Sequence, residues 1–322
     1  MKKFLLFVFA LLLPLGAGAE EEVKIDGIYY RIGVIPWENY APYAEVEGCD
    51  HCYGEIVIPE KIVWQNKTYP VTGFKRGAFA GCENITSVVL PDGIEKIGDG
   101  AFEYCTKLTS VRFPKGVKTI GCGAFEGCLS FTTFEIPNTV TAIEEAAFKD
   151  CKFLTTIRIP AGVKSIDSSV FDGCVNLTSI TIPEGVKAIE SSAFENCSAL
   201  KSITIPSTVT KICGAAFAGC KGLTTITLPD NVTEVYGKVF MNCINLKTIY
   251  LGPNIKGIPD GIFENCKNLT DIYLKATKCP FTPLYAFDRN VPCERITLHV
   301  PNDVVDMYKG MIPWNKFNIV GM

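Results

Sequence analysis

Apolar side chains recur at one fixed interval along most of this chain. A phenylalanine occupies every 23rd position nine times in succession, without an insertion or deletion, and a cysteine stands at the third position after each one. The phenylalanines are Phe79, Phe102, Phe125, Phe148, Phe171, Phe194, Phe217, Phe240 and Phe263. A fixed period of roughly 20 to 50 residues is typical of a solenoid, in which each repeat packs only on its neighbours.

The pattern within one unit predicts a strand with a single buried face. In the unit at 176–198, Leu177, Ile180 and Ile182 are apolar, and nearly all their equivalents in the other units are Leu, Ile, Val or Phe. Ile180 and Ile182 are separated by one residue, which is the period at which side chains return to one face of a strand. Successive units then stack as a parallel sheet with strands about 4.8 Å apart.

The rest of the unit predicts two further sides of a coil. Pro183 closes the strand because it lacks an amide donor, and Gly185 suits a turn. Val186 and Ile189 indicate a second, shorter extended side, and the stretch 192–198 indicates one helical or 3₁₀ turn. The predicted fold is therefore a right-handed repeat solenoid that is mostly β, with one parallel β-sheet and short helical or 3₁₀ turns.

The cysteine of each unit has two interpretations. Cysteine is a small apolar side chain with a weak thiol donor, which suits a tight buried bend. Stacked cysteines could instead form disulfides between units, and an exported chain with 15 cysteines would ordinarily be interpreted in that way. Because the column holds an odd number of cysteines without a gap, we expect free buried thiols.

The two ends depart from the repeat. Residues 1–19 have the parts of a secretory signal peptide: Lys2 and Lys3, a short apolar run, and Ala17-Gly18-Ala19 before the expected cleavage site. We expect an N-terminal β-rich cap at 20–75, the solenoid at 76–278 and a C-terminal cap at 279–322. The mature protein is then exported, either secreted, on the cell surface or in a periplasm, and has no further membrane segment.

Charge and motifs exclude several functions. Without Lys2 and Lys3 the chain carries 29 basic against 34 acidic residues and has no basic stripe, so nucleic acid is not an expected partner. It contains no Gly-rich phosphate loop, HExxH motif or GxSxG motif. With only two histidines in the sequence, we expect no enzyme activity and no cofactor.

The repeated stretch Leu177 to Cys197, with Ile-Pro after the strand and Ala-Phe before the cysteine, resembles the BspA-type leucine-rich repeat. The resemblance covers about residues 56–275 and extends to both ends, where Ile25 to Tyr30 is similar to the family's first hairpin and Val300 to Val320 to its closing segment. It implies an exported binding or adhesion protein of the bacterial surface. It implies no reaction and carries over no ligand residues.

Binding residues must therefore be sought among the outward positions of the strands, which a rigid sheet displays at regular spacing. Tyr250 and Tyr273, with Lys247 and Asp271, form an expected aromatic patch, and tyrosine is enriched at binding hot spots. The alternative is that they only complete the sheet. Oligomeric state is left open by the sequence.

A second group lies on three successive units. Arg112, Glu135 and Arg158 are expected to be neighbours, and their simplest role is to neutralise one another across strands. A ligand role for the three is the alternative.

Cysteines outside the repeat suggest disulfides. Cys49 and Cys52, with His51 between them, favour a local disulfide or free thiols over a metal site, because zinc normally needs four ligands. Cys279 and Cys293 flank a loop and are a second possible disulfide. No metal site is expected.

Together these features predict an exported, non-enzymatic scaffold that binds a host or microbial surface protein or glycan on its exposed sheet. The alternative is a structural or carbohydrate-associated accessory protein of the cell envelope that acts mainly as a spacer.

Overall fold

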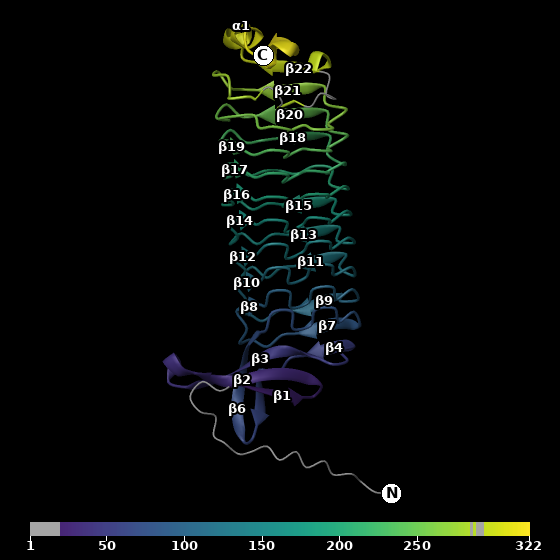
Figure 1. Ribbon diagram of the computed structural model, residues 1–322, viewed down its shortest axis with the longest axis vertical. Helices are drawn as coiled ribbons and strands as arrows, with labels where there is room; N and C mark the ends of the chain where they lie inside the picture. Colours follow the sequence, from purple (N-terminus) through teal and green to yellow (C-terminus); the bar gives the residue numbers. More distant parts are fainter. Residues whose placement is uncertain (1–19, 284–285, 288–292) are drawn as a thin grey trace.

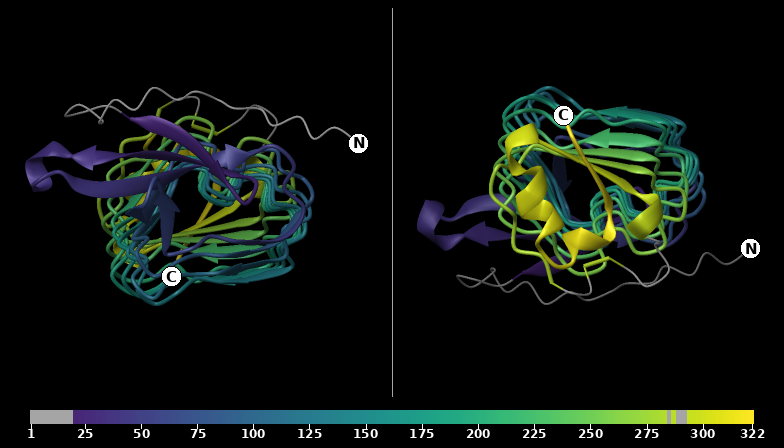
Figure 2. Two further views of the ribbon diagram at one scale, coloured as in Figure 1. Left: turned by 90° about the horizontal axis from the view of Figure 1, so that it is seen from below. Right: turned by 90° about the horizontal axis from the view of Figure 1, so that it is seen from above.

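The protein is one long stack of coils with a cap at each end (Figure 1). The computed structural model describes residues 20–283, 286–287 and 293–322, so the predicted signal peptide at 1–19 lies outside the described residues. The coils repeat with a period of about 23 residues and superimpose when viewed along the stack, which confirms the predicted solenoid (Figure 2). Among the described helices, none has the length and apolar character needed to cross a bilayer.

The longer strands of the coils form the main parallel sheet. Within the described residues it has three hydrogen-bonded sections, which are interrupted between β9 and β11 and between β15 and β18. The first section is β4 (Gly54–Val57), β7 (Ile85–Val89) and β9 (Ser110–Arg112). The second is β11 (Thr133–Glu135), β13 (Thr156–Arg158) and β15 (Ser179–Thr181). The third is β18 (Thr225–Thr227), β20 (Thr248–Leu251), β21 (Asp271–Leu274), β22 (Thr297–Val300) and β23 (Asn318–Gly321).

The second extended side is also a parallel sheet, made of very short strands. It comprises β8 (Lys96–Ile97), β10 (Thr119–Ile120), β12 (Ala142–Ile143), β14 (Ser165–Ile166), β16 (Ala188–Ile189), β17 (Lys211–Ile212) and β19 (Glu234–Val235). Among the described strands, its hydrogen bonding is interrupted between β12 and β14. Within each paired section a residue pairs with its equivalent in the next coil, as Ile166 does with Ile189, so these coils lie in register.

The third side is a ladder of turns and not the predicted helical or 3₁₀ turn. Amides there alternate between two kinds of partner: Phe194 donates to Ala216 in the next coil at 2.8 Å, whereas Glu195 donates to Ser192 within its own coil at 3.0 Å. A 3₁₀ turn would direct every amide within the coil. Ser192 and Asn196 have φ of 58° and 59°, and this left-handed backbone interrupts helical geometry.

The phenylalanines form a continuous stack through the core. The Phe171 ring lies 5.9 Å from Phe148 and 5.6 Å from Phe194, centroid to centroid, with planes within 12° of parallel. All nine side chains are fully buried. Identical spacing of the coils therefore lets one ring type fill the same corner in every coil.

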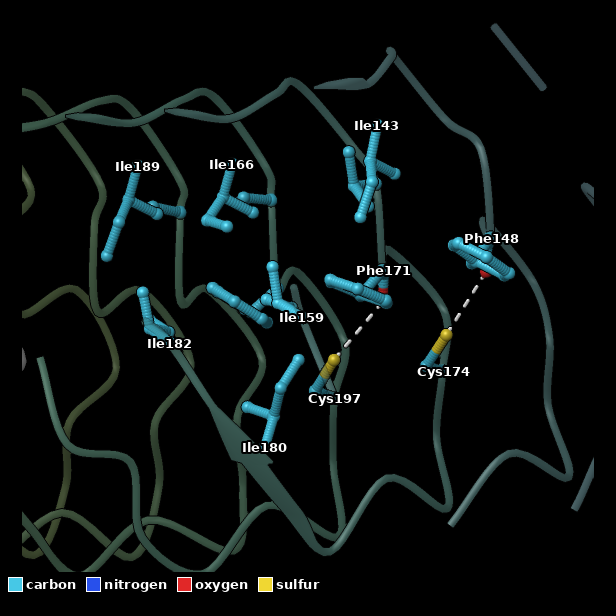
Figure 3. Packing of buried hydrophobic residues seen from close by; sticks show 14 of the residues in the cluster. Ile143, Phe148, Ile159, Ile166, Phe171, Cys174, Ile180, Ile182, Ile189 and Cys197 are labelled. Carbon is cyan, nitrogen blue, oxygen red and sulfur yellow. Dashed lines mark hydrogen bonds between the residues drawn. The ribbon is translucent and has the colours of Figure 1, made fainter. Parts of the chain in front are cut away.

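The cysteines of the column are free thiols that bond the coils together. Cys174 Sγ donates to the Phe148 carbonyl and Cys197 Sγ to the Phe171 carbonyl, each at 3.2 Å (Figure 3). The same contact recurs from Cys105 to Cys266. Each such carbonyl also accepts the amide of the cysteine that follows in its own coil, as Phe171 accepts from Cys174 at 3.2 Å. The expectation of free buried thiols is confirmed for these cysteines.

Caps close both ends of the stack. The N-terminal cap is a sheet in the order β1-β2-β3-β6-β5, made of β1 (Glu21–Ile25), β2 (Ile28–Ile35), β3 (Ala41–Cys49), β5 (Lys61–Trp64) and β6 (Lys67–Phe74), with η1 (Pro36–Glu38) between β2 and β3. The C-terminal cap contains η2 (Cys293–Arg295), η3 (Asn302–Val304), α1 (Val305–Lys309) and η4 (Trp314–Lys316). Phe287 packs edge to face with Trp314 and Phe317 there, and it covers the last phenylalanine of the column.

Candidate functional site

The predicted aromatic patch is part of a three-ring column on β20, β21 and β22. Tyr250, Tyr273 and His299 occupy equivalent positions in paired strands, and we call them the aromatic column. The Tyr250 and Tyr273 ring centroids lie 4.5 Å apart, and those of Tyr273 and His299 lie 4.0 Å apart with planes 4° from parallel. The parallel sheet holds these rings face to face because each strand sets its neighbour's register.

Sequence reasoning missed His299 as a member of this column. The spacing from Tyr250 to Tyr273 equals the period of the repeat, whereas His299 follows Tyr273 at a longer interval, so counting by the period fails there. The alternation in Thr297–Val300 matches that in Asp271–Leu274 and could have aligned the two strands.

A hydrogen-bonded carboxylate supports the column. His299 Nε2 donates to Asp271 Oδ1 at 2.8 Å, and Thr270 Oγ1 donates to Asp271 Oδ2 at 2.8 Å. The bond from His299 lowers the pKa of the Asp271 carboxyl below its usual value. Lys247 is exposed and lies immediately before β20. Three of the four residues predicted for this patch thus lie on β20 and β21, and Lys247 precedes β20.

Ring stacking determines what the aromatic column can contact. The facing rings cover one another, and all three side chains are half-buried. The ring edges and the tyrosine hydroxyl groups therefore face outward, while few ring faces remain for stacking. Such a surface suits a partner that offers hydrogen-bonding groups to a rigid row of donors and acceptors.

Arg112, Glu135 and Arg158 do not neutralise one another as expected. Glu135 and Arg158 are register partners on β11 and β13, but β9 with Arg112 belongs to another section of the sheet. Among the ion pairs of the described residues, none joins any two of these three side chains. The expected ion pairing across these strands is therefore not formed, although Glu135 and Arg158 are neighbours as expected.

Extra phenylalanines account for the separation of β9 from β11. Phe113, Phe131 and Phe134 occupy inward positions where most coils carry Leu or Ile. Phe134 contacts Phe113, Phe131 and Phe125, with ring centroids 5.7, 4.5 and 5.2 Å away. These larger side chains need more space between the two coils than branched aliphatic ones.

A cleft of about 600 Å³ opens at this interruption. Phe113 and Phe134 line it together with Glu135, Asn138 and Arg158. Sequence reasoning did not find the cleft, although the run of phenylalanines in the aliphatic columns was its signal.

The remaining cysteine predictions have different outcomes. The structure joins Cys49 and Cys52 by a disulfide bond. Cys279 keeps a free thiol, so the suggested bridge to Cys293 is not formed. Cys293 is buried in η2, whereas Cys279 is half-buried at the start of the preceding loop.

The Asp271–His299 contact makes a testable contribution to stability. Because the pKa of Asp271 is lowered on folding, its contribution is complete above the ordinary value of 3.8 and is lost as the pH falls through the folded value. We expect Asp271→Asn to lower the free energy of unfolding by less than about 1 kcal/mol at pH 5. Urea unfolding from pH 5 to pH 2 should show that the free energies of unfolding of the wild-type protein and the variant converge. A constant difference over that range would contradict the assignment, and Asp303→Asn, at an exposed position in η3, is the control.

A family model and several solved structures match this chain. Residues 72–201 and 187–309 match the family model described as "BspA type Leucine rich repeat region (6 copies)". A leucine-rich repeat protein from Bacteroides ovatus has a TM-score of 0.57 at 21% identity, covering 93% of this chain and 99% of its own. A leucine-rich repeat protein from T. pallidum has a TM-score of 0.54 at 28% identity, covering 63% and 91%.

A protein named as a leucine rich cell surface protein from Faecalibacterium prausnitzii has a TM-score of 0.54 at 24% identity, with 95% of each chain covered. No match was found among curated proteins. The family model covers well over half of the sequence. This chain therefore belongs to the BspA-type leucine-rich repeat family.

Proposed function

We propose that this protein is an exported, non-enzymatic binding scaffold that recognises a surface protein or glycan of a host or microbe through its main sheet. The aromatic column is the observation that carries the proposal. Its three stacked side chains, with the Asp271 carboxylate beside them, present fixed polar edges on strands that cannot rearrange without breaking the stack.

Family and sequence support the export part of the proposal. Residues 1–19 have the composition of a signal peptide, and a structural relative is named as a cell surface protein. A preorganised surface loses little conformational freedom on binding, which suits recognition outside the cell.

A binding screen followed by mutation tests the proposal. The mature protein is screened against arrays of extracellular matrix proteins and of host and microbial glycans, and each saturable ligand is taken to titration. For the true ligand we expect Tyr250→Ser with Tyr273→Ser to weaken binding tenfold or more. Tyr40→Ser with Tyr53→Ser is the matched control, because these exposed tyrosines lie outside the aromatic column.

Other outcomes separate the alternatives. If the double variant Glu135→Ala with Arg158→Ala loses binding and the tyrosine variant does not, the binding site is the cleft between β9 and β11. Unchanged binding in both variants would refute a sheet-face site. A protein with no saturable ligand would favour the spacer role in the cell envelope.

A further inference from the structure

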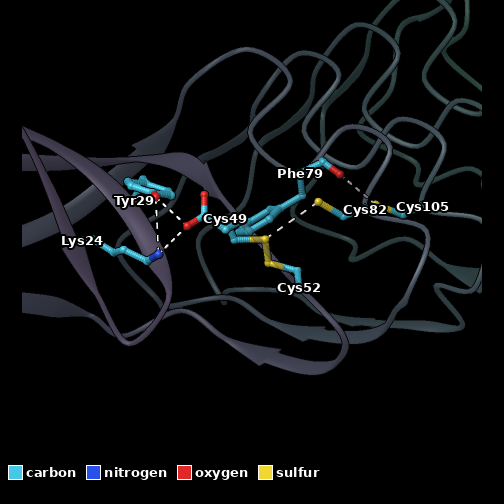
Figure 4. The surroundings of a disulfide bond; sticks show 8 residues. Lys24, Tyr29, Cys49, Cys52, Phe79, Cys82 and Cys105 are labelled. Atoms are coloured by element: carbon cyan, nitrogen blue, oxygen red, sulfur yellow. Dashed lines mark hydrogen bonds and ion pairs between the residues drawn. A yellow bond between two sulfur atoms is a disulfide. The ribbon is translucent and has the colours of Figure 1, made fainter.

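The first cysteine of the column has a different partner from the others. From Cys105 onward each thiol donates to the phenylalanine carbonyl of the preceding coil. Cys82 belongs to the first unit of the column, and the chain before it is the cap, which has no equivalent phenylalanine. Its sulfur instead lies 3.9 Å from Cys49 Sγ, at the end of β3 (Figure 4).

This contact places a free thiol against a disulfide bond. Cys49 is bonded to Cys52, and the three sulfur atoms lie within 4.8 Å of one another. All three side chains are half-buried, so none is sealed in the core. Cys49 is the disulfide sulfur that contacts Cys82, and rotation of the Cys82 side chain into line with the Cys49–Cys52 bond would make Cys52 the leaving group.

The sulfur that would leave, that of Cys52, lies next to a cleft. Cys52 lines a cleft of about 450 Å³, together with His51 and Tyr53. This cleft is lined on one side by the hairpin of β1 and β2 and on the other by β4. A thiolate released there is accessible to a small molecule in solution.

We propose that Cys49, Cys52 and Cys82 form a thiol–disulfide exchange site whose external substrate is a small-molecule disulfide. The Cys82 thiolate attacks Cys49 Sγ, the Cys49–Cys52 bond breaks, and a Cys49–Cys82 bond forms as Cys52 leaves as a thiolate. One disulfide is lost and one is gained, so this step needs no oxidant or reductant. The Cys52 thiolate then attacks a small disulfide, forms a mixed disulfide with one half, and releases the other half as a thiolate.

The exchange changes what the disulfide holds together. Before it, the bond closes a short loop within the cap, between Cys49 and Cys52. After it, the bond joins the end of β3 in the cap to the first coil, across 33 residues of sequence. Burial raises the pKa of the Cys82 thiol, so the exchange is expected to accelerate as the pH rises.

Peptide mapping of the unmodified chain provides the first test. The mature protein is incubated at pH 7 and pH 9, quenched with acid, alkylated and digested with trypsin without reduction. Cleavage after Arg31, Lys61, Arg76 and Lys96 leaves Cys49 and Cys52 on peptide 32–61 and Cys82 on peptide 77–96. We expect a cross-linked pair of these peptides, formed faster at pH 9. A bridge confined to peptide 32–61 at both pH values and all times overturns the proposal.

Variants in a Cys122→Ser background, which removes an exposed thiol, provide the second test. With oxidised glutathione as the probe, the parent is expected to take up one glutathione at Cys52, and Cys82→Ser none. Cys52→Ser is expected to form the Cys49–Cys82 bridge. Equal glutathione uptake at Cys52 with and without Cys82, or failure of Cys52→Ser to form the bridge, refutes the exchange. If a variant does not fold, the peptide map of the parent shows whether the bond between peptides 32–61 and 77–96 forms.

Discussion

Replacing Phe171 by alanine is expected to lower the free energy of unfolding by about 3–5 kcal/mol. The ring is fully buried and lies between the rings of Phe148 and Phe194, so its removal leaves a cavity with aromatic walls on both sides. The neighbouring coils are fixed by two sheets and a turn ladder, and they cannot collapse into the space. Guanidinium unfolding followed by circular dichroism measures the change.

The control for this substitution is an exposed phenylalanine of the same repeat. Phe153 is 55% exposed, and Phe153→Ala is expected to change the free energy of unfolding by less than about 0.5 kcal/mol. Equal losses in the two variants, or a loss below about 1 kcal/mol for Phe171→Ala, would show that the ring stack does not stabilise the coils as described.

Deleting a single residue is expected to damage the fold more than deleting one whole repeat. Removal of residues 176–198 joins Val175 to Ala199 and deletes one full period of the repeat. Every remaining side chain therefore keeps its inward or outward direction. Removal of Thr181 alone brings Ile182 to an outward position on β15 and Pro183 to an inward one, because side chains alternate between the two faces of a strand. We expect the single deletion to cost about 3 kcal/mol or more, from lost burial and a broken ladder.

The two deletions are distinguished by circular dichroism and denaturation. The whole-repeat deletion should leave the circular dichroism per residue unchanged and unfold in one cooperative transition. It loses only the stability contributed by one coil and one interface between coils. A single deletion that unfolds at the same denaturant concentration as the full-length chain would contradict strict register between coils.

Much of the solenoid could be predicted because its repeats agree with one another. The recurrence of Phe171 and Cys174 revealed the period, and the spacing of Ile180 and Ile182 revealed the buried face of the strand. The third side was predicted less well. Positions such as Ser192, Asn196 and Tyr104 adopt positive φ without being glycine, because hydrogen bonds to the next coil hold them there. Local preference does not reveal such a conformation.

The candidate site was predictable only where the period held. Tyr250 and Tyr273 were found because they are one period apart, whereas His299 follows a longer insertion. The cleft near Glu135 depends on the volume of three phenylalanines, and the period alone carries no information about volume. Likewise, the contact between Cys82 and Cys49 joins the cap to the first coil, and the repeat pattern does not extend across that boundary.

The interruptions in the two sheets lie between different pairs of coils. Where β9 and β11 are unpaired, β10 and β12 are paired, and where β12 and β14 are unpaired, β11 and β13 are paired. The gap between β15 and β18 is likewise spanned by β16, β17 and β19. In the described part of the molecule, one sheet is therefore hydrogen-bonded between coils wherever the other is interrupted. Tension along the axis of the stack is transmitted from coil to coil through these hydrogen bonds.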